Sequence, residues 1–197
     1  MSYDIKRSVS LYSYQDEYYN NQLNIAKQYG IDDEVAWANN NIGLLLLHLR
    51  NLEFANIYLQ EAKELAEQIG DDYMLQYVYS NIGWYKLEME EYDSSVCYFN
   101  MALDIRMKPP VDNIDVAASY RDLGNVYFAQ HSYAEAKYYY GLSNTWVDTI
   151  TSDMSAAINV NMAHIYIDEN KPDSALYCAH KAVGCARRFV DRMVLRD

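Results

Sequence analysis

The chain has 197 residues, of which 51% are hydrophobic, so it can bury a substantial core and is not a disordered segment. Its 28 acidic and 16 basic residues give a net charge of −12, which argues against a nucleic-acid backbone or an anionic membrane as the main partner. The chain has only 7 glycines and 3 prolines, the residues most often found in turns, which favours long helices over an all-β domain.

Targeting and redox signals are sparse. Nothing in the first twenty residues resembles a signal peptide, and the longest apolar run, residues 42–47, is too short to span a bilayer. The three cysteines, Cys97, Cys178 and Cys185, form no pairing motif, which fits a reducing compartment. We expect a cytoplasmic location, with a periplasmic sensory domain as the alternative if a signal has been removed.

A pattern of about forty residues recurs four times along the chain. Each unit has a small anchor residue, and the anchors are Gly43, Gly83, Gly124 and Ala163. Small residues recur twelve positions after each anchor, at Ala55, Ser95, Ala136 and Ala175, and larger residues sixteen positions after the first three, at Leu59, Phe99 and Tyr140. A fixed period in this range indicates stacked helical units that bury their faces on one another.

Each unit predicts one helix before a tight turn and one helix after it. Residues 14–30 look like the second helix of an earlier unit, and Gly70 and Asp71 or Asp72 predict a left-handed cap followed by a new helix start. The expected helix pairs cover residues 33–49 and 53–69, 73–89 and 92–107, 114–130 and 133–150, and 154–169 and 172–190. The segment 108–112, which contains two prolines, is the clearest break.

The domain organisation follows from this period. We expect one solenoid with a partial N-terminal repeat, four full repeats and a short tail, at residues 1–30, 31–70, 71–111, 112–151, 152–190 and 191–197. Neither end shows the polar capping unit that a complete solenoid carries, so we expect the chain to be part of a longer protein.

The repeat resembles the tetratricopeptide repeat, whose pattern runs Trp, Leu-Gly, Tyr, Ala, Phe and a final Pro. The resemblance covers residues 36 to about 190, but the final Pro is missing and the opening Trp is replaced by Asn39, Tyr79, Tyr120 and Asn159. It implies an all-α, right-handed superhelical solenoid of helix–turn–helix repeats. The long period is similar to that of bacterial regulatory tetratricopeptide proteins.

Helical periodicity also predicts a binding face. At 100° per residue, the positions six before, two before, one after and five after the anchor lie opposite the side that packs within the unit. In a right-handed solenoid this opposite side faces the concave groove. The predicted peptide-binding residues are Trp37, Asn41, Leu44, His48, Tyr77, Asn81, Trp84, Asp122, Asn125, Asn161 and His164, with Asn40 and Arg121 at the edge.

One position of this face is polar in every unit, as Asn41, Asn81, Asp122 and Asn161. An amide both donates and accepts, so a row of amides can hold the backbone of an extended peptide. Asparagines do this in other tetratricopeptide groove binders, and the resemblance implies the same role here. The alternative is that these side chains bridge neighbouring helices.

The same face carries an apolar patch made of Trp37, Leu44, Tyr77 and Trp84. Aromatic residues on a face that packing does not require often mark a binding site. The alternative is that these rings pack between adjacent helices.

No catalytic motif stands out. The chain lacks a glycine-rich phosphate loop, a His-Glu-x-x-His motif and a Cys-x-x-Cys pair, so we expect no enzyme activity and no cofactor. Cys178 and Cys185 are interpreted as structural thiols and not as metal ligands.

The function predicted from the sequence is a protein- or peptide-binding scaffold or sensory module within a bacterial regulatory protein. The alternative is a structural adaptor or oligomerisation module that contacts partners through the convex second helices. Self-association, and a DNA-binding or catalytic domain outside this chain, stay open.

Overall fold

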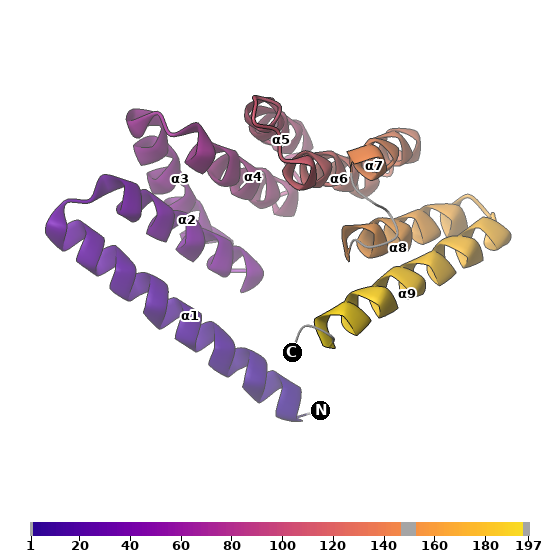
Figure 1. Ribbon diagram of the computed structural model, residues 1–197, viewed down its shortest axis with the longest axis horizontal. Helices are drawn as coiled ribbons and strands as arrows, with labels where there is room; N and C mark the ends of the chain where they lie inside the picture. The colour runs from indigo at the N-terminus through magenta and orange to yellow at the C-terminus, as the bar shows by residue number, and fades with distance from the viewer. Residues whose placement is uncertain (1, 147–152, 195–197) are drawn as a thin grey trace. The chain divides into compact units, whose positions relative to one another are not determined.

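The computed structural model describes residues 2–146 and 153–194, and these residues form helices joined by short turns with no strand (Figure 1). The helices are α1 (Ser2–Tyr29), α2 (Asp32–His48), α3 (Leu52–Ile69), α4 (Asp72–Glu88), α5 (Tyr92–Arg106), α6 (Asn113–Ala129), α7 (Tyr133–Trp146), α8 (Asp153–Asp168) and α9 (Pro172–Val194). The all-α prediction is therefore confirmed for the described residues.

Most helix ends lie within one residue of their predicted positions. Helix α1 begins much earlier than expected, at Ser2, and α9 continues to Val194, so residues 191–194 belong to a helix and not to a separate tail. The predicted end of the helix after Tyr133 and the repeat boundary between 151 and 152 lie outside the described residues. Four repeats in succession place α2, α4, α6 and α8 first in each pair (A helices), and α3, α5, α7 and α9 second (B helices).

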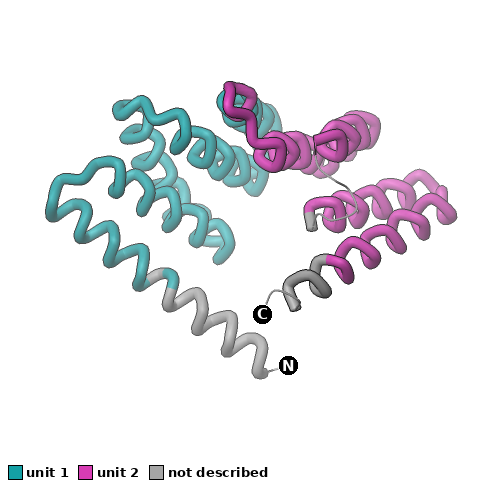
Figure 2. The backbone as a smooth tube through the Cα atoms, in the orientation of Figure 1, with its two compact units in different colours: residues 1–105 teal, residues 106–197 magenta. Residues whose placement is uncertain are grey.

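The chain divides into two compact units, residues 1–105 and 106–197 (Figure 2). In the first unit, α1 packs on α2, α2 on α3, α3 on α4, and α2 also contacts α4. In the second unit, α6 packs on α7, α7 on α8, α8 on α9, and α6 also contacts α8. Within each unit, these neighbouring helices pack on one another, and its two A helices touch, α2 with α4 and α6 with α8. This is the packing of a helix–turn–helix solenoid.

The glycine anchors lie where the A and B helices of a pair approach most closely. A Cβ atom built on Gly43 would lie 2.7 Å from Leu59, one on Gly83 would lie 2.8 Å from Phe99, and one on Gly124 would lie 2.6 Å from Tyr140. These three partners are fully or almost fully buried. The absence of a Cβ therefore makes room for a large side chain of the facing helix.

The fourth pair departs from this packing. Its anchor is Ala163, and the residue sixteen positions later, which corresponds to Leu59, Phe99 and Tyr140, is Ala179. Unlike its three counterparts, Ala179 is exposed and not buried.

The turns inside the pairs share one backbone conformation. The seventh residue after each anchor has a positive φ, at 60° for Arg50, 58° for Glu90, 59° for His131 and 55° for Asn170. In each turn the next residue donates its N–H to a carbonyl five residues earlier, as in Asn51 to Leu46 and Lys171 to Tyr166. This is a helix end of the Schellman type, built here without glycine.

The turns between pairs use the predicted capping residues. Gly70 is left-handed, with φ of 73°, and ends α3. The Asp71 carboxylate accepts from the N–H groups of Tyr73 and Met74 at 2.9 and 3.2 Å, which satisfies free donors at the start of α4. Asp112 does the same for α6. The expected caps at Gly70 and Asp71 are confirmed.

A substitution at the Gly83 anchor tests the close approach. Gly83→Leu forces the added side chain into the buried Phe99 ring and is expected to lower the free energy of unfolding by about 1–3 kcal/mol. Gly141→Leu is the matched control, because a Cβ at Gly141 in α7 meets nothing within 4 Å. Chemical denaturation should show a loss only for Gly83→Leu. Equal effects would contradict the packing assignment.

The shared turn conformation gives a second test. A non-glycine residue at positive φ is strained by about 1 kcal/mol, so Glu90→Gly is expected to raise the free energy of unfolding by roughly that amount. Asn170→Gly is expected to gain less, because asparagine tolerates this conformation better than glutamate. Thermal melts that rank the two variants in the opposite order would contradict this account.

Candidate peptide-binding face

The face of each A helix opposite its anchor is more open than the anchor side. On α2, Trp37, Asn41 and Leu44 are half-buried and His48 is exposed, whereas Ile42 and the neighbouring anchor are buried. On α4, Tyr77 and Trp84 are half-buried, and Asn81 is buried. The predicted face is thus partly open on both A helices of the first unit.

Three aromatic rings cluster on this face of the first unit. The ring centroid of Trp37 lies 5.8 Å from that of Tyr77 and 6.1 Å from that of Tyr73, and the two tyrosine rings are 5.4 Å apart. Tyr73 is 62% exposed, so the cluster opens to solvent. The structure therefore brings Trp37 and Tyr77 together, as neighbours on adjacent A helices.

Sequence reasoning missed Tyr73, which lies one turn before Tyr77 on α4. The i, i+4 spacing of two tyrosines beside a predicted groove was the available signal. Trp84, which was grouped with these rings, packs edge-on against Phe99 at 5.7 Å and so contributes to the core of the first unit.

The amide side chains of the first unit divide between two roles. The Asn81 Nδ2 donates to the Asn40 Oδ1 at 2.8 Å, which links α4 to α2. This is the bridging alternative, and both residues are buried. Asn41 is half-buried and makes no side-chain hydrogen bond to the described residues. Its donor and acceptor groups therefore remain open to a ligand.

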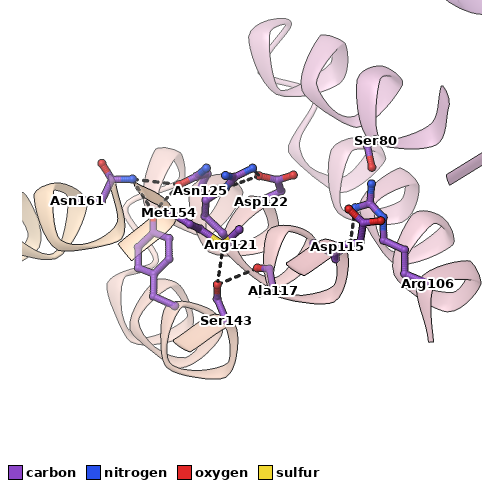
Figure 3. A network of polar contacts seen from close by, with 12 residues as sticks. Ser80, Arg106, Asp115, Ala117, Arg121, Asp122, Asn125, Ser143, Met154 and Asn161 are labelled. Atoms are coloured by element: carbon purple, nitrogen blue, oxygen red, sulfur yellow. Dashed lines mark hydrogen bonds and ion pairs between the residues drawn. The ribbon is translucent and has the colours of Figure 1, made fainter. Parts of the chain in front are cut away.

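The predicted polar residues of the second unit form a network of their own (Figure 3). The Tyr140 hydroxyl of α7 donates to the Asn125 Oδ1 at 2.8 Å, and the Asn161 Nδ2 of α8 donates to that oxygen at 3.0 Å and to the Tyr140 oxygen at 2.9 Å. One cluster thus ties α6, α7 and α8 together. His164 lies outside it and is exposed.

The acidic member of the predicted row, Asp122, is neutralised within the second unit. Its buried Oδ1 accepts from the Nε and Nη2 atoms of Arg121, at 2.9 and 2.8 Å. The pair compensates the charge of a carboxylate that is only 3% exposed. Arg121 and Asp122 therefore form a hydrogen-bonded ion pair with each other.

The described residues show no group of three or more His, Cys, Asp or Glu side chains that could hold a metal ion. Cys178 and Cys185 are buried on α9, and burial raises the pKa of the Cys178 thiol while the Lys181 charge opposes this shift. None of the helices in the described part of the chain is long and apolar enough to cross a membrane.

The stacked helix pairs and their partly open A-helix face define a helical-repeat scaffold. Residues 34–108 and residues 116–141 each match a family described as "Tetratricopeptide repeat", so the chain contains tetratricopeptide repeats. Such repeats typically mediate contacts between proteins, and neither match indicates a catalytic family.

Other comparisons bear on the fold. A comparison with curated proteins finds no match. Among solved structures, the chain is similar to one described as "Crystal structure of BtubC (BKLC) from P. vanneervenii", with 24% identity, a TM-score of 0.58 and coverage of 73% of this chain. This chain spans 56% of that one, and at this identity the similarity concerns the fold alone.

Alkaline pH tests the buried tyrosines that join the helices. Burial, the largest cause, raises the pKa of Tyr140 and that of Tyr79 from 10.0 to about 12. The contribution of these two groups to the free energy of unfolding is fully present below about pH 10 and is lost as the pH rises towards 12. The reason is that the phenols lose their protons at a lower pH in the unfolded chain than in the folded one. Denaturation at pH 8 to 11.5 should show this decline, and Tyr140→Phe should make it shallower. Tyr138→Phe, at an exposed site, is the control and should leave the slope unchanged.

Proposed function

We propose that the chain is a protein-interaction module that binds an extended segment of a partner protein on the open face of its A helices. The observation that carries this proposal is the ring cluster of Trp37, Tyr73 and Tyr77, which opens to solvent at Tyr73, together with the amide of Asn41, which bonds no described residue. Trp37 and Asn41 are one helical turn apart and therefore share a face of α2.

The chemistry of this face suits a peptide. Aromatic rings offer large contact areas at low entropic cost, and such residues dominate the binding energy of protein interfaces. An amide that both donates and accepts can pair with a peptide backbone regardless of the peptide's sequence. The two features together support the binding of an extended chain.

The amides that bridge helices have a different part in the proposal. Asn81 and Asn161 are held by neighbouring side chains, at 2.8 Å and at 2.9–3.0 Å. They hold the face rigid, so that a ligand binds side chains whose positions are already fixed.

We extend the proposal to a bacterial regulatory setting, because the forty-residue period resembles that of regulatory tetratricopeptide proteins.

A structural adaptor that uses the B helices is the second candidate. It is favoured by exposed rings on that side, since Tyr138 on α7 is 63% exposed and Tyr177 on α9 is 62% exposed. In that case the A-helix face would not be required for partner capture.

A peptide-display selection on the wild-type protein, with ten-residue peptides, tests the proposal. Selected peptides are then titrated against the double variant Tyr73→Ala with Asn41→Ala, which removes one exposed ring and the Asn41 amide but no hydrogen bond between helices. Loss of an aromatic anchor alone is expected to weaken binding about thirtyfold. The melting temperature should stay nearly unchanged, because Tyr73 is exposed and Asn41 bonds no described residue.

Tyr138→Ala is the matched control on a B helix and should leave these affinities intact. The reverse ranking, with binding lost in Tyr138→Ala and kept in the double variant, would favour the structural adaptor.

A further inference from the structure

Two positions of the repeat, four before the anchor and fifteen after it, carry paired tyrosines in the second and third repeats. The rings of Tyr79 and Tyr98 lie 6.1 Å apart, and those of Tyr120 and Tyr139 lie 6.5 Å apart. The Tyr79 hydroxyl also donates to Glu67 of α3 at 3.1 Å. Tyr79 therefore reaches from α4 to both neighbouring B helices, α3 and α5, and fills the space between them.

The fourth repeat lacks both rings. The corresponding residues are Asn159 and Cys178, and a cleft opens at this place among α7, α8 and α9. It has two chambers of ≈ 460 Å³ and ≈ 470 Å³, and both are lined by Asn144, Asn159, Tyr177 and Lys181. Ligand sites commonly have volumes of about 300–1,000 Å³.

The first repeat also carries an asparagine at the earlier position, but that residue is enclosed. Asn39 is fully buried, and its Nδ2 donates to the Glu61 Oε2 at 3.1 Å, while Tyr58 keeps the ring of the pair. The fourth repeat thus differs from the first by the loss of the second ring.

The cleft carries positive charge in a chain whose net charge is −12. Lys181 occupies the position held by Met101 and Leu142 in the two preceding repeats, and its ammonium lies 5.0 Å from the Tyr177 ring centroid. Besides Lys181, the charged side chains of the lining are Lys137, Asp173 and Arg188, and His180 is the histidine among the lining residues. Lys137 is paired with Glu169 at 2.5 Å, whereas no carboxylate of the described residues pairs with Lys181.

We propose that this cleft binds an aromatic side chain carried by an acidic segment of a partner protein. The ring takes the space that a tyrosine pair fills in the preceding repeats, against the apolar side chains of Ile158 and Met162. Carboxylates that flank the ring lie near Lys181 and gain charge-assisted contacts there.

The shape of the cleft favours a peptide over a compact ligand. Its lining follows α9 from Asp173 to Arg188, a distance of about 22 Å at 1.5 Å per residue. An extended segment of about six or seven residues spans this length at roughly 3.3 Å per residue, and a five-residue peptide covers about three quarters of it. This site lies among α7, α8 and α9 of the second unit and is separate from the ring cluster on α2 and α4 that carries the proposed function.

The test is a calorimetric titration of the whole chain with the peptide Asp-Glu-Tyr-Glu-Asp. Replacing its tyrosine by alanine is expected to weaken binding about thirtyfold, and replacing its four acids by lysine should remove binding. Asn159→Tyr with Cys178→Tyr restores the ring pair of the preceding repeats, closes the cleft and should abolish binding. Lys181→Glu keeps the cleft but reverses its charge, should also abolish binding, and remains informative if the ring-restoring variant fails to fold.

The A-helix double variant Tyr73→Ala with Asn41→Ala should bind this peptide like the wild type, so failure of one proposal is distinguishable from failure of the other. Undetectable binding to the wild type, or equal binding to the ring-restoring variant, would overturn the inference. Self-association of the wild type that Lys181→Glu removes would also overturn it, since a second copy would then be the occupant.

Discussion

Within each glycine-anchored repeat, the fold depends on the approach of an A helix to its B helix over a residue without a Cβ. Gly43, Gly83 and Gly124 leave room for Leu59, Phe99 and Tyr140, which are buried at the centre of each pair. Because these side chains fill the space beside the anchor, the opposite side of the A helix is not needed for packing within the pair. The contact at the anchor therefore determines which side of the A helix is buried within the pair and which side is not.

The turns inside the pairs repeat this arrangement along the chain. Each A helix ends at a left-handed residue seven positions after its anchor, so every B helix starts in the same direction. Links between successive turns add to this, since Arg50 pairs with Glu88 in the first unit and Tyr133 bonds Asp168 in the second. Such exposed links contribute little individually, but their carboxylates recur at one position of the repeat, five residues after the anchor.

Polar side chains at one position of the A helices differ in whether they bond a neighbouring helix. Asn81 and Asn161 bridge helices, while Asn41 keeps its amide open, although all three occupy one position of the repeat. The tyrosine pair behaves similarly, because it fills a space in two repeats and is absent in the fourth, where the space becomes a cleft. The sites that we propose thus lie where the chain departs from its repeat pattern.

The sequence alone determined the helices, the anchors and the tight turns, because these follow from local periodicity and from residues with special backbone geometry, such as Gly70 and Asp71. It also identified the A-helix face, since the direction of a side chain along a helix is fixed by 100° steps. Only the tertiary structure decided which side chains on that face are already used. The distance between neighbouring helices decides three contacts on this face. They are the hydrogen bond between Asn81 and Asn40, the packing of Trp84 on Phe99, and the contact of Tyr73 with Trp37. The cleft beside Lys181 likewise depends on how far α7 and α9 stand apart over Asn159, which is a property of packing between repeats that no single helix encodes.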